Sequence, residues 1–237
     1  PDLLTGFYGS YDVMPEVGVY LIAVNGWDLT VDGNRSKTLG GGVPHRFMPL
    51  PDGGWLYEGD ISFIAGAERP GINDLRWLVD YSAKVRVLDD LQVALELVYG
   101  QEDGAGYNKQ GMQDGVHAAD WYGGMLTTTY RAPDEAPAWL NGWAGALRFE
   151  YVRDRDLAIS LPQPVGVEPD QTTLFGTALT LRYELVHGIV AVAEYKTDFE
   201  RADVEGFPVL RYYPDEPYNI FKWFITREVI VGLVGSF

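Results

Sequence analysis

The stretch Leu75-Arg76-Trp77-Leu78-Val79-Asp80-Tyr81-Ser82-Ala83-Lys84-Val85-Arg86-Val87 decides the fold class. Every second residue, starting with Leu75, is apolar or aromatic, whereas the residues between them are mostly charged or polar. Successive side chains of a β-strand point to opposite faces. The segment therefore predicts a long strand with one apolar face and one charged face.

The same alternation recurs along the chain, and helical periodicity is nearly absent. It is clearest over residues 55–65, 91–99, 143–154, 175–185 and 189–199, and further strands are expected to begin near Leu3, Val17, Lys37, Trp121 and Lys222. Together these segments make about 11 strands of roughly 10 residues, which is the length with which a tilted strand crosses a bilayer.

Short and long connections between the expected strands alternate. The short ones lie near residues 13–16, 49–54, 87–90 and 186–188, with a medium one at 131–141; the long polar ones lie at 28–36, 101–120, 154–171 and 200–219, with a shorter member at 66–73. Outer-membrane barrels have short periplasmic turns and longer external loops. The sequence thus predicts an all-β protein, a transmembrane antiparallel up-and-down β-barrel domain over residues 1–237.

The end of the chain adds to this prediction. The last segment is apolar and finishes on Phe237, and such an end resembles the C-terminal signal that outer-membrane barrels present to the insertion machinery. If Phe237 lies on the periplasmic side, the first of the 11 strands runs inward from outside. Barrels of this type have an even number of strands. We therefore expect an odd number of strands to precede Pro1, supplied by an N-terminal portion or a second chain.

Composition excludes several classes of function. The 237 residues include 34 acidic and 18 basic side chains, for a net charge of −16, and nucleic-acid binding needs a basic face instead. No cysteine is present, so disulfides, thiolate metal sites and cysteine nucleophiles are excluded. The three histidines, His45, His117 and His187, are too scattered to indicate a zinc site.

A soluble β-sandwich that binds carbohydrate is an alternative, since its strands alternate too, with the apolar face packed inside. Two features favour the membrane. The expected strands exceed the usual 5–6 residues. Aromatic residues also stand near strand ends, where they suit interfacial girdles; these are Trp55, Trp77, Tyr99, Trp121, Trp143, Tyr151 and Tyr195.

Several segments also carry a family pattern. Asn25-Gly26-Trp27-Asp28, Asp32-Gly33-Asn34 and Lys37-Thr38-Leu39-Gly40 follow one another like the block "NGWD…DNN…KTLG", and residues 121–124, 147–154, 181–185 and 192–198 match later strands more loosely. In this order they resemble the putative beta-barrel porin-2 family, the OmpL-like porins of Gram-negative bacteria. The resemblance covers nearly the whole chain but only the later part of such porins.

The resemblance implies a diffusion channel in the bacterial outer membrane for small hydrophilic solutes or ions, with no catalytic residue and no cofactor. It also implies contact with outer-membrane lipid and lipopolysaccharide, and with the barrel-insertion machinery during biogenesis. A barrel that acts as a scaffold or sleeve among other subunits of an outer-membrane assembly is the alternative from another class.

Charges that line the lumen of a porin set its selectivity. The alternation predicts the following pore-lining residues: Glu58, Asp60, Arg76, Asp80, Lys84, Arg86, Glu96, Arg148, Glu150, Arg182, Glu184, Glu194 and Lys196. They are nearly balanced in sign. Neighbouring pairs such as Arg148 and Glu150, Arg182 and Glu184, or Glu194 and Lys196 could instead form ladders that hold the wall rigid.

Most of the acidic excess lies in the long connections, which predicts an acidic external mouth that favours cations. Asp28, Asp32 and Asn34 offer oxygen ligands, but their spacing fits no calcium motif, and no metal site is expected. The pair Glu58 and Asp60 is equally weak as a glycosidase signal. Pro44, next to His45, predicts an edge, a bulge or a distorted strand, because proline donates no ladder hydrogen bond.

Overall fold

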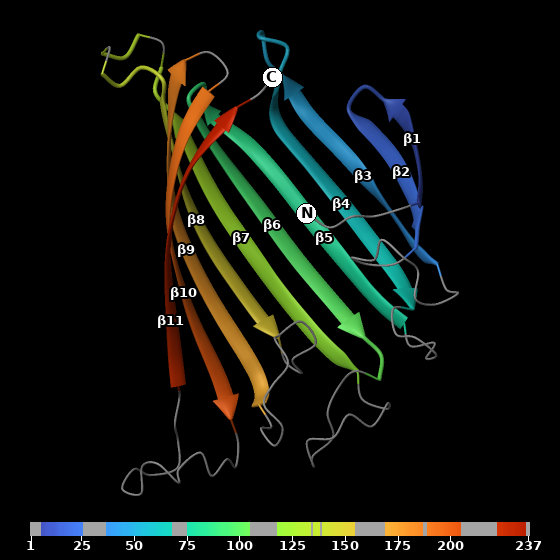
Figure 1. Cartoon of the computed structure of the whole chain (residues 1–237). Helices are drawn as coiled ribbons and strands as arrows, with labels where there is room; N and C mark the ends of the chain where they lie inside the picture. Colours follow the sequence, from blue (N-terminus) through green and yellow to red (C-terminus); the bar gives the residue numbers. More distant parts are fainter. Residues whose placement is uncertain are drawn as a thin grey trace, which may run out of the picture.

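The computed structural model describes residues 6–25, 37–67, 75–104, 118–133, 135–137, 139–154, 169–186, 189–204 and 222–235. Eleven antiparallel strands form one sheet in chain order (Figure 1). Their bounds are β1 Gly6–Met14, β2 Val17–Val24, β3 Thr38–Pro49, β4 Trp55–Ala67, β5 Leu75–Leu88, β6 Leu91–Glu102, β7 Ala119–Arg131, β8 Trp143–Asp154, β9 Pro169–Val186, β10 Ile189–Val204 and β11 Lys222–Gly235. None of the described segments is a helix that could span a membrane.

The strand count and the up-and-down order confirm the predicted fold class. β8 has the predicted bounds, while β9 and β10 extend further into the long connections than their alternation indicated. The short connections lie together along one edge of the sheet, here called the short-turn edge, and the strand ends before the long connections lie along the opposite, long-loop edge (Figure 1).

The ladder register carries the two faces of β5 across the sheet. Directly paired residues share a face. Ser82, on the charged face of β5, pairs with Asp60 of β4 and with Glu96 of β6. Glu96 in turn pairs with Met125 of β7, and Met125 with Glu150 of β8. We call the face that holds these residues the inner face and the opposite, apolar one the outer face.

The outer face is apolar and uncovered. Phe7 is 84% exposed, Leu21 68% and Phe149 53%, and buried apolar side chains are few in the described part of the chain. A sandwich would pack this face against a second sheet. The described residues form a single sheet, so the sandwich alternative is excluded. An apolar outer face of this kind is suited to lipid.

The distortion predicted at Pro44 is confirmed on one side of β3. The pairing of β2 with β3 lapses between Val17, which pairs with His45, and Tyr20, which pairs with Gly42. On the other side, Pro44 pairs with Asp60 in an unbroken β3–β4 ladder. β3 is therefore an internal strand rather than an edge, and the proline interrupts only the ladder to β2.

The sheet curves but is not closed. Its two edge strands are β1 and β11, which do not pair with each other in the described part of the chain (Figure 1). The prediction that further strands complete a larger, even-stranded barrel is therefore not tested by this sheet.

Candidate pore wall

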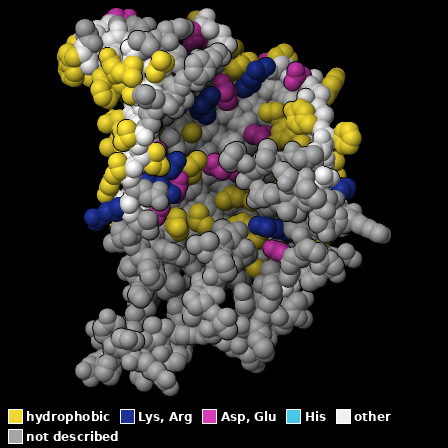
Figure 2. All heavy atoms as spheres, in the orientation of Figure 1, with side chains coloured by type: hydrophobic (Ala, Val, Ile, Leu, Met, Phe, Trp, Pro, Cys, Tyr) yellow, Lys and Arg dark blue, Asp and Glu magenta, His cyan; other side chains and the backbone are white. Residues whose placement is uncertain are grey.

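Each residue predicted to line the pore lies on the inner face by ladder register. Figure 2 shows Lys, Arg, Asp and Glu side chains in the hollow of the sheet and hydrophobic ones along its outer margins. Alternation predicts which residues of one strand share a face, and the ladder register places the charged faces of neighbouring strands on the same side of the sheet. Whether these residues line a pore stays a prediction.

Several of these charges form ion pairs on the wall. Lys84 Nζ lies 2.8 Å from Glu58 Oε2 across β5 and β4, and Arg148 Nε lies 2.6 Å from Glu150 Oε1 along β8. Arg148 also reaches Glu194 of β10 at 4.0 Å. Lys196 pairs with Asp198 at 3.1 Å rather than with Glu194, which accepts from Thr180 Oγ1 at 2.7 Å. The pairs thus run both along and across strands.

A second group of charges on the wall is acidic. Asp60, Asp80 and Glu96 surround Ser82 on three adjacent strands. Within the described residues, none of these three carboxylates has a basic partner at ion-pair distance. Like charges on neighbouring positions repel one another and create a negative potential. We therefore expect a negative potential along this part of the wall.

Two tyrosines that sequence reasoning left unassigned also lie on the inner face. Tyr20 donates a hydrogen bond to Asp60 Oδ2 at 2.9 Å, and its ring stacks with that of Tyr8 at a centroid distance of 5.9 Å. Period-two counting along residues 6–14 would have found this face, since Tyr8, Ser10 and Asp12 alternate there with Phe7, Tyr11 and Val13.

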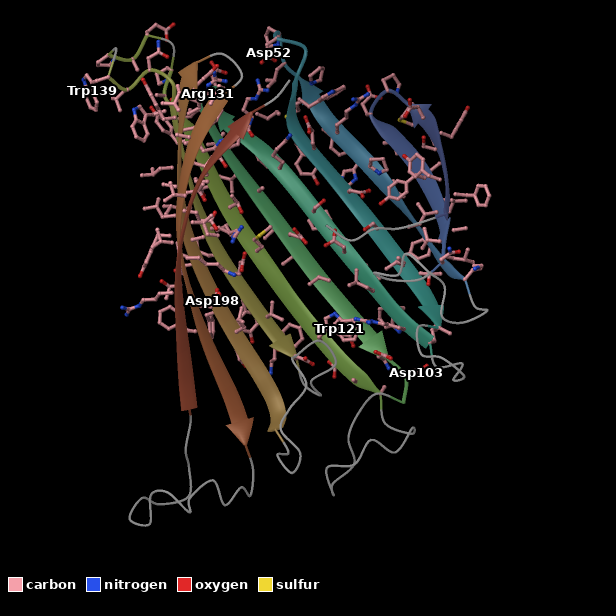
Figure 3. The ribbon with its side chains drawn as sticks, viewed as in Figure 1. Asp52, Asp103, Trp121, Arg131, Trp139 and Asp198 are labelled. Carbon is pink, nitrogen blue, oxygen red and sulfur yellow. The ribbon has the colours of Figure 1, made fainter. Side chains whose placement is uncertain are left out.

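Trp121 corrects the predicted aromatic girdle. Gly100 and Trp121 are directly paired, on the same face as Arg76 and Glu102. The Arg76 guanidinium lies 5.2 Å from the centroid of the Trp121 ring, which is only 3% exposed. Figure 3 shows Trp121 toward the long-loop edge, near Asp103. Trp121 is therefore part of the inner wall and does not face lipid.

The other predicted girdle residues lie at different heights between the two edges of the sheet. Trp77 contacts Tyr99, and Tyr151 contacts Phe175, on the outer face toward the long-loop edge, with ring centroids 5.4 and 5.0 Å apart. Trp143 and Trp55 begin strands at the short-turn edge. Tyr195 lies instead near the middle of β10. The girdle role of the residues at the two edges remains a prediction.

At the short-turn edge, an ion pair joins a turn residue to a strand. In the turn between β3 and β4, Gly54 N–H donates to Asp52 Oδ1 at 2.9 Å, and Arg86 pairs with Asp52 Oδ2. The Gly54 hydrogen bond and the Arg86 guanidinium hold the pKa of Asp52 below its ordinary value. Asp52 lies at the short-turn edge in Figure 3.

Some predicted features lie outside the described residues. They are Phe237 and the oxygen-ligand group of Asp28, Asp32 and Asn34, together with several acids of the long connections, among them Asp114, Asp156, Glu168, Glu205, Asp215 and Glu216. The described part of the chain contains no group of three or more His, Asp or Glu side chains arranged to hold a metal ion. His45 faces outward and bonds Val43 O and the Tyr57 hydroxyl.

A single antiparallel sheet with an apolar outer face and a charged inner face defines the class of membrane channels built from strands. Residues 1–211 match the family described as putative beta-barrel porin-2, OmpL-like, and the chain belongs to that family. It is thus a porin-like channel of the bacterial outer membrane. The resemblance stated from the sequence is confirmed.

No curated protein matches the chain. Among solved structures, the chain is similar to the NanC porin in a rhombohedral crystal form, at 10% identity and a TM-score of 0.46, with 97% of this chain and 91% of that chain covered.

Proposed function

We propose that the protein lets small hydrophilic solutes and ions diffuse through a water-filled lumen. The observation that carries the proposal is the inner face of charged and other polar residues, which extends across the central strands while the outer face is apolar. A strand wall satisfies its own backbone hydrogen bonds, so it can separate water from lipid. A wide wall leaves room for water within.

The same proposal includes closure of the barrel. Each unpaired backbone group at a sheet edge in lipid costs several kcal/mol, on the order of the cost of burying an unpaired amide. Strands that pair with the free sides of β1 and β11 would remove that cost. An odd number of them would give the even total that such barrels have.

Diffusion is tested by conductance of the complete protein in planar bilayers. We expect ohmic channels that prefer cations, because Asp60, Asp80 and Glu96 have no basic partner within the described residues. Asp80→Asn with Glu96→Gln should move the reversal potential under a salt gradient toward zero. Asp89→Asn, in the short turn between β5 and β6, removes a charge outside the wall and is the matched control.

Three results would contradict the proposal or part of it. Absence of conductance from folded protein would favour the sleeve within an outer-membrane assembly. Anion preference, or a reversal potential unchanged by the double variant, would contradict the role of the acidic group.

A further inference from the structure

The inner wall carries an aromatic floor next to the free side of β1. Tyr8 and Tyr20 stack with their planes 30° apart, and Tyr8 is 67% exposed. The ring of Tyr20 lies flat over Gly42, where an added Cβ would meet its hydroxyl and ring atoms at 2.6 to 2.7 Å. The hydrogen bond to Asp60 fixes the far end of the ring. The close contact with Gly42 and the hydrogen bond to Asp60 together hold the Tyr20 ring in place.

Polar groups border this floor on the same face. Ser10 pairs with Tyr20, and Asp12 pairs with Gly18, so the two side chains continue along β1 from Tyr8 toward the short-turn edge. Ser10 and Asp12 are both exposed. Hydroxyl and carboxylate groups thus stand beside an open aromatic surface.

Asp12 also lines a hollow of about 680 Å³ on the inner wall, together with Glu58, Lys84 and Glu96. Volumes of roughly 300–1,000 Å³ are usual for small-molecule sites. With Glu16 and Arg46, which also line it, the hollow supplies acceptors from four carboxylates and donors from the Lys84 ammonium and the Arg46 guanidinium. The aromatic floor and the hollow adjoin, because Gly18 lines the hollow and lies two residues from Tyr20 on one face of β2.

We propose that this part of the wall is a binding subsite for a neutral carbohydrate in transit, centred on Tyr8 and Tyr20 with Asp12 as the hydroxyl acceptor. The inference rests on the proposed diffusion function and names a solute class for it. One face of a pyranose ring presents C–H groups, which pack against an aromatic ring. Its hydroxyls donate to carboxylates, which form stronger hydrogen bonds than neutral acceptors do.

The chemistry of the site favours this class over others. A simple metal ion would bind the carboxylates and would leave the stacked tyrosine rings without a contact. An anionic solute would meet the four carboxylates of the hollow against two basic groups. Of these, Lys84 is itself bound to Glu58, and Arg46 donates to Pro15 O. A purely apolar solute would leave the exposed carboxylates without partners and desolvated. A molecule with both C–H faces and many hydroxyls satisfies all of these groups.

The test is interruption of single-channel current by maltotriose, with the complete protein in planar bilayers. We expect maltotriose to interrupt the current for resolved times, and polyethylene glycol of similar size to do so much more briefly. In Tyr8→Leu, residence times should fall about tenfold, the size of one lost aromatic contact. Tyr8→Phe keeps the ring and should retain them. Tyr11→Leu changes a tyrosine on the outer face of β1 and serves as the matched control.

A second variant acts without altering either tyrosine. Gly42→Ala places a methyl group where the Tyr20 ring lies, so it should also shorten the residence time while open conductance persists. Normal conductance with no interruption by maltotriose, or equal residence times in Tyr8→Leu and wild type, would overturn the subsite but leave diffusion intact. Absence of any conductance would overturn the diffusion function itself.

Discussion

Among the described glycines of the inner wall, Gly100 lies closest to a side chain, the Trp121 ring. A Cβ at Gly100 would lie 2.3 to 2.7 Å from three atoms of the indole. Gly100→Ala should therefore displace the ring and disturb its packing with Arg76. We expect a loss of about 1–3 kcal/mol in the free energy of unfolding, the usual cost of overpacking.

Urea titration of protein folded into lipid vesicles measures this loss. Gly145→Ala, in β8, is the control, because its nearest neighbour would lie at 3.6 Å, an ordinary contact. Equal stabilities of the two variants would show that the Trp121 ring moves aside at no cost.

The Asp52 carboxyl provides a pH-dependent contact of the turn after β3. Its pKa is depressed by Gly54 N–H and by Arg86, so the folded state favours the carboxylate. The contribution to stability is therefore present above the ordinary pKa of about 3.9 and is lost as pH falls through the depressed value.

NMR of the protein in micelles can follow this titration. We expect the Gly54 amide shift to change only below pH 3.9, and Asp52→Asn to abolish the transition. A Gly54 transition at or above the ordinary pKa would contradict the contact.

Single residues show where sequence reasoning reaches its limit. Alternation placed every predicted charge on one face, because face follows from position within a strand. The girdle assignment of Trp121 was wrong, because it rested on the position of Trp121 near a strand end. Such a position predicts the height of a residue in the membrane but not the face on which its side chain lies. Glu96 pairs with Met125, and Trp121 is four residues from Met125, so both lie on the inner face. That deduction needs the β6–β7 register, which the sequence does not supply. Ion-pair partners, such as Asp198 for Lys196, depend on rotamers that no pattern specifies.

At the scale of the element, β8 offers a direct test of the two faces. Leu147 lies on the outer face near the middle of the strand, 48% exposed, and its neighbour Ala146 lies on the inner face. Leu147→Arg should cost about 2–4 kcal/mol, because a charge on the lipid face is most unfavourable near the bilayer midplane. Ala146→Arg adds the same charge toward the lumen and should cost much less.

Unfolding of both variants in urea, from vesicles, gives the comparison. A larger cost at Ala146 than at Leu147 would reverse the assignment of the faces and, with it, the proposed pore.

Strand bounds were predicted best where alternation meets a compact turn. β8 begins at Trp143 after a turn in which Leu140 and Asn141 donate backbone hydrogen bonds to Pro137, and both its ends were predicted. β9 and β10 run on toward the long connections, over residues such as Thr172 and Ala202 that carry no alternating signal. Pairing with a long neighbour, rather than the residues themselves, extends such strands.

At the scale of the whole molecule, the sheet has two free edges, at β1 and β11. The sequence predicts that further strands complete the barrel there. In β1, backbone N–H groups alternate sides, so every second one points away from β2. If further strands close the barrel, these groups are hydrogen-bonded. If the sheet ends at β1, water in the lumen reaches them, and an exposed edge of this kind favours aggregation.

Amide hydrogen exchange of the complete protein in micelles distinguishes the two cases. Closure predicts that consecutive amides of β1 exchange slowly, as those of the central strand β6 do. An open edge predicts slow and fast exchange in alternation along β1, with β6 as the internal reference. Alternating exchange would contradict the proposed closure, and with it the separation of a water-filled lumen from lipid on which diffusion through this protein depends.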